Sequence, residues 1–166
     1  MANEALRGSC ARSRENAVLS NPDLKQLVEG AADAIVVCDA QGAITFWNRS
    51  AERIFGFTEA DALGQSLDLI IPQRQRQRHW DGYQKTMDTG VTKYGADLLR
   101  VPALHKDGRT LSIAFTVSML HLADGKVSGI VAIVRDETKR FAEDRELRKR
   151  LAELESQAGA ATAASH

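Results

Sequence analysis

The sequence predicts an α+β fold, in which a five-stranded antiparallel sheet carries helices on one face. Two observations lead to this prediction. Short β runs stand at both ends of the folded region, at 33–48 and at about 95–135, and helical segments lie between them. The run "LSIAFTVSML" also alternates apolar and polar side chains, so that Ile113, Phe115, Val117 and Met119 share one side. This period of two is typical of a strand with one buried face.

Length and composition narrow the function classes. The chain has 166 residues, which suits one domain with extensions, and its 22 basic and 22 acidic side chains balance. A neutral chain has no general attraction for nucleic acid or anionic membranes. No apolar run approaches the ~18 residues that span a bilayer, and the N-terminus lacks the apolar core of a signal peptide. Cys10 lies in a polar tail and Cys38 in an apolar strand. We therefore expect no disulfide and a cytoplasmic protein.

The first half of the chain alternates capping signals with short elements. Residues 1–20 are polar and form a tail or an N-terminal cap. A helix follows in "SNPDLKQLVEG", and two strands in "DAIVVCD" and "AITFWN" flank a hairpin turn. Asn48 is placed to cap a short helix, and Thr58 with Asp61 has the spacing of a capping box for the next.

The second half contains one longer helix and three strands. We expect the helix from about 72 to 89, and strands at roughly 95–104, 110–121 and 127–135 that are joined by Asp-Gly turns. The arginines of this helix alternate with glutamine, which spreads their charges around it and favours a solvated face over a nucleic-acid stripe. His105 and His121 flank the middle strand at turns and are expected at the surface.

The last segment predicts a dimerisation helix over 139–158. Leu147, Leu151, Leu154 and Ala158 follow a 4-3-4 spacing among dense charges, which is a heptad seam with no domain left to pack against. We expect a homodimer with these helices parallel, which passes a signal to a downstream protein in trans. Residues 159–166 are low in complexity and expected to be a disordered tail.

From residue 24 to about 140 the sequence resembles a PAS domain, a sensory module common in bacterial signalling proteins. The resemblance rests on "DAIVVCDAQGAITFWNRSAERIFGF", on "HKDGRTLSIAFTVSML" and on the closing "GIVAIVRDETKR". It implies the five-stranded sheet described above over 21–138, with a ligand pocket between the long helix and the inward face of the sheet. It does not identify the ligand, since the family binds haem, flavin, fatty acids, small acids or nothing.

Within the family, the long helix resembles that of haem-binding oxygen sensors. Those proteins place a proximal histidine seven residues after a proline, and Pro72 and His79 have this spacing. At 100° per residue, the apolar residues of the helix fall on one side with His79, so that this face can cover a porphyrin and ligate its iron. The expected site combines haem b, His79 as metal ligand, Arg76 near a propionate, and apolar walls formed by Trp80, Tyr83, Met87, Leu99, Ile113, Phe115 and Val117.

Other readings stay open at this point. The same histidine and its neighbours would serve equally as core in a ligand-free dimerisation and partner-binding module, or in a pocket for flavin or a fatty acid. The oxygen sensors carry an arginine where this chain has Leu99, with Arg100 one place away and so expected on the opposite face. Light-oxygen-voltage photoreceptors, a subclass of the family, carry a reactive cysteine just before the long helix. This chain has "GQSLDLIIP" there, without a cysteine, so their light-driven adduct chemistry is excluded. No catalytic signature is present, and we expect no enzyme.

Overall fold

Side chains that accept backbone N–H groups start the first helices of the chain. Ser20 and Asp23 form a capping box at the first helix, and Thr58 and Asp61 form another at the third. Asn48 accepts the backbone N–H of Ala51 and caps the second. The caps at Asn48 and Thr58 confirm those expected from the sequence.

The structure is a computed structural model that describes residues 20–92 and 97–164, with side chains described as far as residue 157. The elements, in chain order, are α1 (Asn21–Gly30), β1 (Ala34–Asp39), β2 (Ile44–Trp47), α2 (Arg49–Phe55), α3 (Glu59–Ala62), the 3-10 turn η1 (Leu67–Leu69), α4 (Gln73–Thr89), β3 (Leu99–Leu104), β4 (Thr110–His121), β5 (Val127–Asp136) and α5 (Thr138–Ala164).

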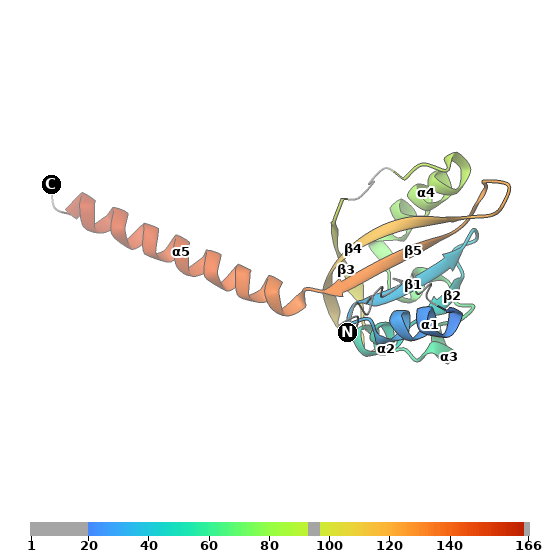
Figure 1. Ribbon diagram of the computed structural model, residues 1–166. Coiled ribbons are helices and arrows are strands. Elements are labelled where there is room, and N and C mark those ends of the chain that lie inside the picture. The colour runs from blue at the N-terminus through green and yellow to red at the C-terminus, as the bar shows by residue number, and fades with distance from the viewer. Residues whose placement is uncertain (1–19, 93–96, 165–166) are drawn as a thin grey trace, which may run out of the picture.

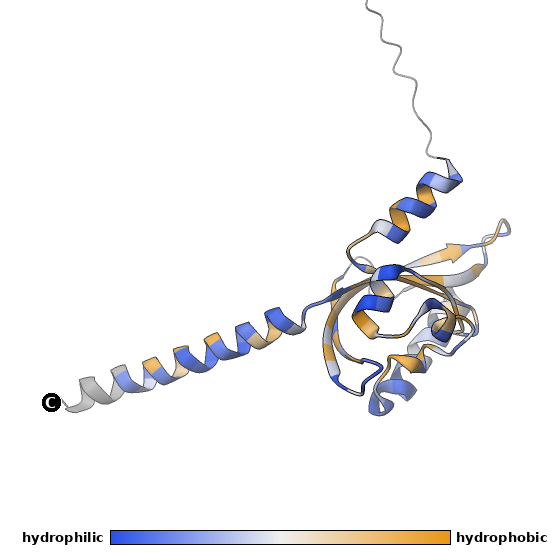
Figure 2. Ribbon diagram, turned by 90° about the horizontal axis from the view of Figure 1, so that it is seen from below, coloured by the Kyte–Doolittle hydropathy of each residue, from blue (hydrophilic) through white to orange (hydrophobic). Residues whose placement is uncertain are grey.

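The sheet is antiparallel, with the strand order β2-β1-β5-β4-β3. Helices α2, α3 and α4 lie on one face, which we call the inner face, and α5 projects away from the body (Figure 1). Helix α1 stands on the other side of the sheet, the outer face (Figure 2). The five-stranded α+β fold is thus confirmed, and none of the described helices is both long and apolar enough to cross a membrane.

The register of the strands decides which side chains reach the core. Phe115 of β4 pairs with Leu99 of β3 and with Val134 of β5, so these three side chains share the inner face. Ile113 and Val117 follow on the same face of β4. The core beneath them is built around the fully buried Trp47, Phe55, Ile44 and Asn48.

Asn48 joins three elements from the centre of the core. Its Oδ1 accepts the N–H of Ile35 and of Ala51, at 2.9 Å each, and its Nδ2 donates to the carbonyls of Val28 and Asp33. One buried amide therefore satisfies backbone groups of α1, β1 and α2. It fixes the C-terminal end of α1 to the body.

Two boundaries differ from those expected. Strand β3 begins at Leu99, although we expected a strand from about 95, and residues 93–96 lie outside the described part of the chain. Helix α5 continues to Ala164, six residues past the predicted boundary at 158, because the alanine-rich end of the chain favours helix. Cys10 and the polar segment 1–19 lie outside the described residues.

Candidate functional site

Helix α4 holds the candidate site against the β1–β2 turn. The helix ends at Gly90, whose φ of +65° is left-handed and whose N–H donates to Thr86. The indole N–H of Trp80 donates to the carboxylate of Asp68 at 2.8 Å. The hydroxyl of Tyr83, one turn later, donates to the carbonyl of Asp39. These two hydrogen bonds fasten the middle of α4 to both η1 and the end of β1.

The Trp80 ring lies directly on Gly42 in the β1–β2 turn. A Cβ at residue 42 would stand 2.3 Å from the ring, far inside van der Waals contact, and Gly42 has a φ of +83°. Only glycine meets both conditions without strain. The contact brings the edge of the indole against the hairpin and closes this end of α4 over the core.

His79 lies beside these two aromatic residues. Its ring centroid is 4.8 Å from that of Trp80 and 5.9 Å from that of Tyr83. Its Nδ1 is buried and has no hydrogen-bond partner in the part of the chain that the structure describes. Burial lowers the pKa of the imidazole, and the nearby carboxylate of Asp68 opposes that shift only in part. His79 is therefore a neutral imidazole with an unsatisfied buried nitrogen, the form that ligates a metal.

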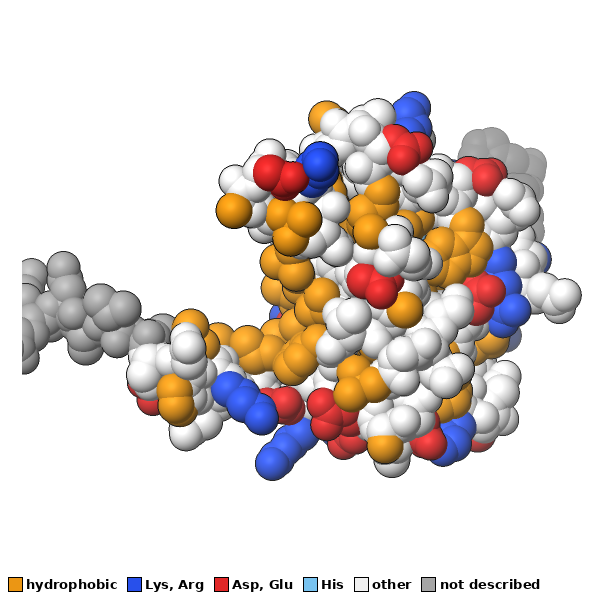
Figure 3. All heavy atoms as spheres, turned by 90° about the vertical axis from the view of Figure 1, so that its right-hand side faces the viewer, with side chains coloured by type: hydrophobic (Ala, Val, Ile, Leu, Met, Phe, Trp, Pro, Cys, Tyr) orange, Lys and Arg blue, Asp and Glu red, His pale blue; other side chains and the backbone are white. Residues whose placement is uncertain are grey.

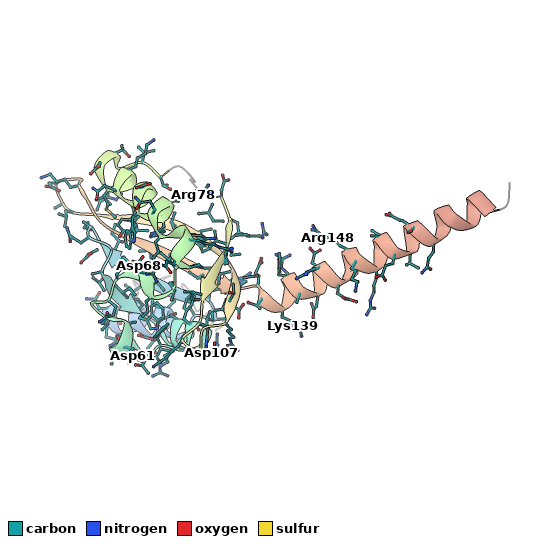
Figure 4. The ribbon with its side chains drawn as sticks, turned by 180° about the vertical axis from the view of Figure 1, so that it is seen from behind. Asp61, Asp68, Arg78, Asp107, Lys139 and Arg148 are labelled. Atoms are coloured by element: carbon teal, nitrogen blue, oxygen red, sulfur yellow. The ribbon has the colours of Figure 1, made fainter. Side chains whose placement is uncertain are left out.

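Arg76 is held by backbone carbonyls. Its guanidinium donates to the carbonyls of Ile71, at 3.2 Å, and Asp68, at 3.0 Å, and lies 3.7 Å from the Asp68 carboxylate. The side chain thus ties α4 to η1 (Figure 4 shows Asp68 close to α4). Its expected role, pairing with a propionate, would require it to leave these carbonyls, and that role stays a prediction.

The structure brings five of the nine expected pocket residues into contact with the core. Tyr83 and Ile113 belong to the buried core cluster, and Trp80, Met87 and Phe115 pack against it. Leu99 and Val117 lie on the same inner face of the sheet, at its β3–β4 side. Arg100 points to the outer face, where it binds Glu137 at 3.3 Å.

The described part of the chain has two open grooves, and only the first borders this arrangement. One, of about 700 Å³, is lined by Trp80, Tyr83 and Met87 on α4 together with residues of the β1–β2 turn and Val127. The other, of about 670 Å³, lies between the start of α5 and Ser112. Neither groove is lined by His79 or by the inner-face residues of β4. A ligand at His79 would therefore have to open space between α4 and the sheet.

Nothing in the sequence singled out Asp68. Its carboxylate accepts the indole N–H of Trp80, lies 3.7 Å from the guanidinium of Arg76 and acts on the pKa of His79. It lies in "SLDLIIP", a segment without a polar motif. No group of three or more His, Cys, Asp or Glu side chains that could hold a metal ion occurs in the part of the chain that is described. A metal at His79 would thus depend on a cofactor for its remaining ligands.

The seam of α5 faces solvent. Leu147, Leu151 and Leu154 are 65%, 57% and 62% exposed, and the side chain of Ala158 lies outside the described ones. Ion pairs four residues apart, such as Arg148 with Asp144, line the rest of the helix. At its root, Glu137 binds Arg100 of β3 and Arg140 of α5. The helix therefore starts from a charged clamp on the sheet and exposes an unpartnered apolar stripe.

Comparisons with known proteins agree with this architecture. The family described as PAS fold matches residues 23–136. The sensor protein FixL of Bradyrhizobium diazoefficiens is 28% identical over 81% of this chain, and the oxygen sensor protein DosP of Escherichia coli is 26% identical over 77%. The crystal structure of a PAS domain from Colwellia psychrerythraea superposes with a TM-score of 0.63 over 71% of this chain and 97% of that one, at 24% identity. The chain spans 25% of the length of FixL and 15% of that of DosP.

Proposed function

Because the chain belongs to the PAS family, we propose that it is a cytoplasmic sensor module that ligates haem b through His79 and responds to a diatomic gas or to redox state. The observation that carries the proposal is the buried Nδ1 of His79, which has no hydrogen-bond partner among the described residues. A buried imidazole nitrogen without a partner costs free energy, and an atom bound at that nitrogen would offset this cost. Similarity to an oxygen sensor protein points the same way.

The residues around His79 divide into two walls. Trp80, Tyr83 and Met87 of α4 would cover the side of His79, and Leu99, Ile113, Phe115 and Val117 of the sheet would form the apolar opposite wall. Haem, when bound, supplies an iron centre that takes up gases or changes oxidation state. The chain's own part is to hold and orient the imidazole, to exclude water, and to convert a shift of α4 into a signal. We assign no catalytic step to it.

Reconstitution with hemin tests this proposal. We expect the wild-type protein to develop a Soret band and His79→Ala to lose it or shift it strongly, with an unchanged far-UV circular dichroism spectrum. His121→Ala is the matched control, because His121 is exposed at the end of β4 and should leave the band as it is. Absence of a Soret band, or equal bands in His79→Ala and wild type, would overturn the haem assignment.

A second candidate is a ligand-free dimerisation and partner-binding module. It is favoured by the closed packing of α4, in which Trp80 and Tyr83 are bonded to Asp68 and Asp39 and no described groove reaches His79. The remaining alternative is a sensor that binds a flavin or a fatty acid, in place of haem, between α4 and the sheet. Absorption at flavin wavelengths, or a lipid released on denaturation and identified by mass spectrometry, separates these outcomes from an empty protein.

Output in this proposal passes through α5. Leu147, Leu151 and Leu154 would pair with the same residues of a second copy in parallel, and a change near His79 would move the helix pair through β4, β5 and the Glu137 clamp. A downstream signalling protein would read that movement in trans. Sedimentation of Leu151→Asp against the wild type tests the seam, and equal masses for the two proteins would leave it without a role.

A further inference from the structure

The groove between α4 and the β1–β2 turn has an apolar floor. Trp80 and Met87 line it from the helix, and Ala40 and Val127 line it from the sheet. The hydrogen bonds of the Trp80 indole and the Tyr83 hydroxyl hold this part of α4 in place. Figure 3 looks onto this end of the body and shows apolar side chains at the surface with acidic ones beside them. An apolar groove that is already formed and open to solvent is typical of a binding site.

Two carboxylates border the apolar floor without a cation to balance them. Asp81 and Asp88 both line the groove. Each accepts a neutral amide donor at 2.8 Å, Asp81 from Gln77 and Asp88 from Gln84. Among the described residues, no Lys or Arg lines the groove and neither carboxylate has an ion pair. The rim therefore carries two negative charges that the described part of the chain leaves unpaired.

The end of α4 adds to this negative charge. The last turn of the helix contains Asp88 and no basic residue. Carbonyl groups at a helix C-terminus carry partial negative charge, so that a cation is favourable there and a carboxylate is not. A positive group from another molecule would be attracted by Asp88 and by the helix end together. Nucleic acid and anionic lipid would be repelled.

The spacing of the two carboxylates selects the shape of a binder. Seven residues of helix place Asp81 and Asp88 on one side of α4, about 10 Å apart along its axis. Two cationic side chains seven residues apart on a second helix have the same separation and also share one side. An extended segment does not reproduce this, because residues three apart, which cover a similar length, point to opposite faces of a strand. Residues three and four positions after the first cation of a helix lie near the same side and would meet the apolar floor.

We infer that this groove docks a basic amphipathic helix of another protein, with Lys or Arg seven residues apart and apolar residues between them. The inference goes beyond the proposed function, since neither haem at His79 nor the seam of α5 uses Asp81 or Asp88. The groove nevertheless lies on α4, the helix that carries His79. A partner bound there would contact the same element that the ligand contacts from the other side.

Titration of the full chain with a designed peptide tests the inference. The peptide is an alanine-rich helix with two arginines seven residues apart and leucine three and four positions after the first. A control peptide of the same composition has its arginines five residues apart, on different sides of the helix. We expect the first peptide to bind more tightly and to shift the NMR signals of the Trp80 indole and of the backbone N–H groups of Gln41 and Val127. The indole signal of Trp47, which is buried in the core, should stay in place.

Variants of the two carboxylates locate the contact. Asp81→Asn combined with Asp88→Asn should weaken binding about fivefold to tenfold, as expected for the loss of two exposed ion pairs. Asp144→Asn combined with Glu153→Gln is the matched control, because it removes two carboxylates from α5 and should leave the affinity unchanged. A protein with both Asp81→Lys and Asp88→Lys should instead prefer a peptide with glutamate in place of arginine.

Three results would overturn the inference: equal affinities for the two peptides, equal affinities of the asparagine variant and its α5 control, or signal shifts centred on α5. A change in the sedimentation mass of the lysine variant without peptide would do the same, because a second copy of the chain would then cover the groove. The titration is done without hemin. It therefore succeeds or fails independently of the haem assignment.

Discussion

Replacing Gly42 by alanine perturbs the contact that closes α4 over the core. Two costs add at this position. A φ of +83° is left-handed, which costs an L-residue about 1–2 kcal/mol. The new methyl group would also stand 2.3 Å from the Trp80 ring, which must move, and overpacking of this kind costs about 1–3 kcal/mol. We expect Gly42→Ala to lower the free energy of unfolding by about 2–5 kcal/mol.

Gly125→Ala is the matched control. Gly125 sits in the β4–β5 turn with a φ of +84°, but a Cβ there meets nothing within 4 Å. It should cost only the backbone strain of about 1–2 kcal/mol. Urea unfolding followed by circular dichroism measures the free energy of unfolding of both variants. When Trp80 is also replaced by alanine, Gly42→Ala should cost no more than Gly125→Ala, because the ring that the new methyl group would meet is gone. Equal destabilisation of Gly42→Ala and Gly125→Ala would refute the claim that the indole packs on the turn.

Three further predictions concern the core, pH and ligand preference. Asn48→Ala should cost about 3 kcal/mol in urea unfolding, because it strands the N–H groups of Ile35 and Ala51; a loss below 1 kcal/mol would contradict its joining role. Burial lowers the pKa of His79. The unfolded chain therefore binds a proton first as pH falls below about 6.5, and stability should drop toward acid. His79→Gln should flatten this part of the stability curve, and an identical slope would argue against burial as the cause. In reduced protein loaded with hemin, Arg100→Ala should leave oxygen affinity unchanged in a gas titration, since Arg100 binds Glu137 on the outer face. Leu99→Arg should raise that affinity; the opposite pattern would reverse the assignment of the two faces.

Much of the fold follows from local patterns. The alternation in β4 predicted that Ile113, Phe115 and Val117 share a face, and the register confirms it. The same period of two placed Leu99 inside and Arg100 outside, as observed. Helix caps at Asn48 and Thr58 were equally readable, because capping depends on residues only three positions apart.

The contacts that shape the candidate site were not readable in this way. Asp68 and Trp80 are 12 residues apart, and Gly42 lies 38 residues before Trp80, so that their meeting depends on how the elements pack. The surface position expected for His105 is wrong. Only 14% of its side chain is exposed, because Lys106 donates its N–H to Phe55 and draws the turn over Gly56. Turn residues of this kind are buried by tertiary contacts rather than by their own sequence pattern.

The central claim is that the ring of His79 is a ligand. His79→Gly reconstituted with hemin, with and without free imidazole, tests it most directly, because the small molecule can occupy the place of the missing ring. The account predicts a weak or shifted Soret band for His79→Gly alone and a band that returns toward that of the wild type when imidazole is added. A variant that binds hemin with the wild-type spectrum in the absence of imidazole would contradict it.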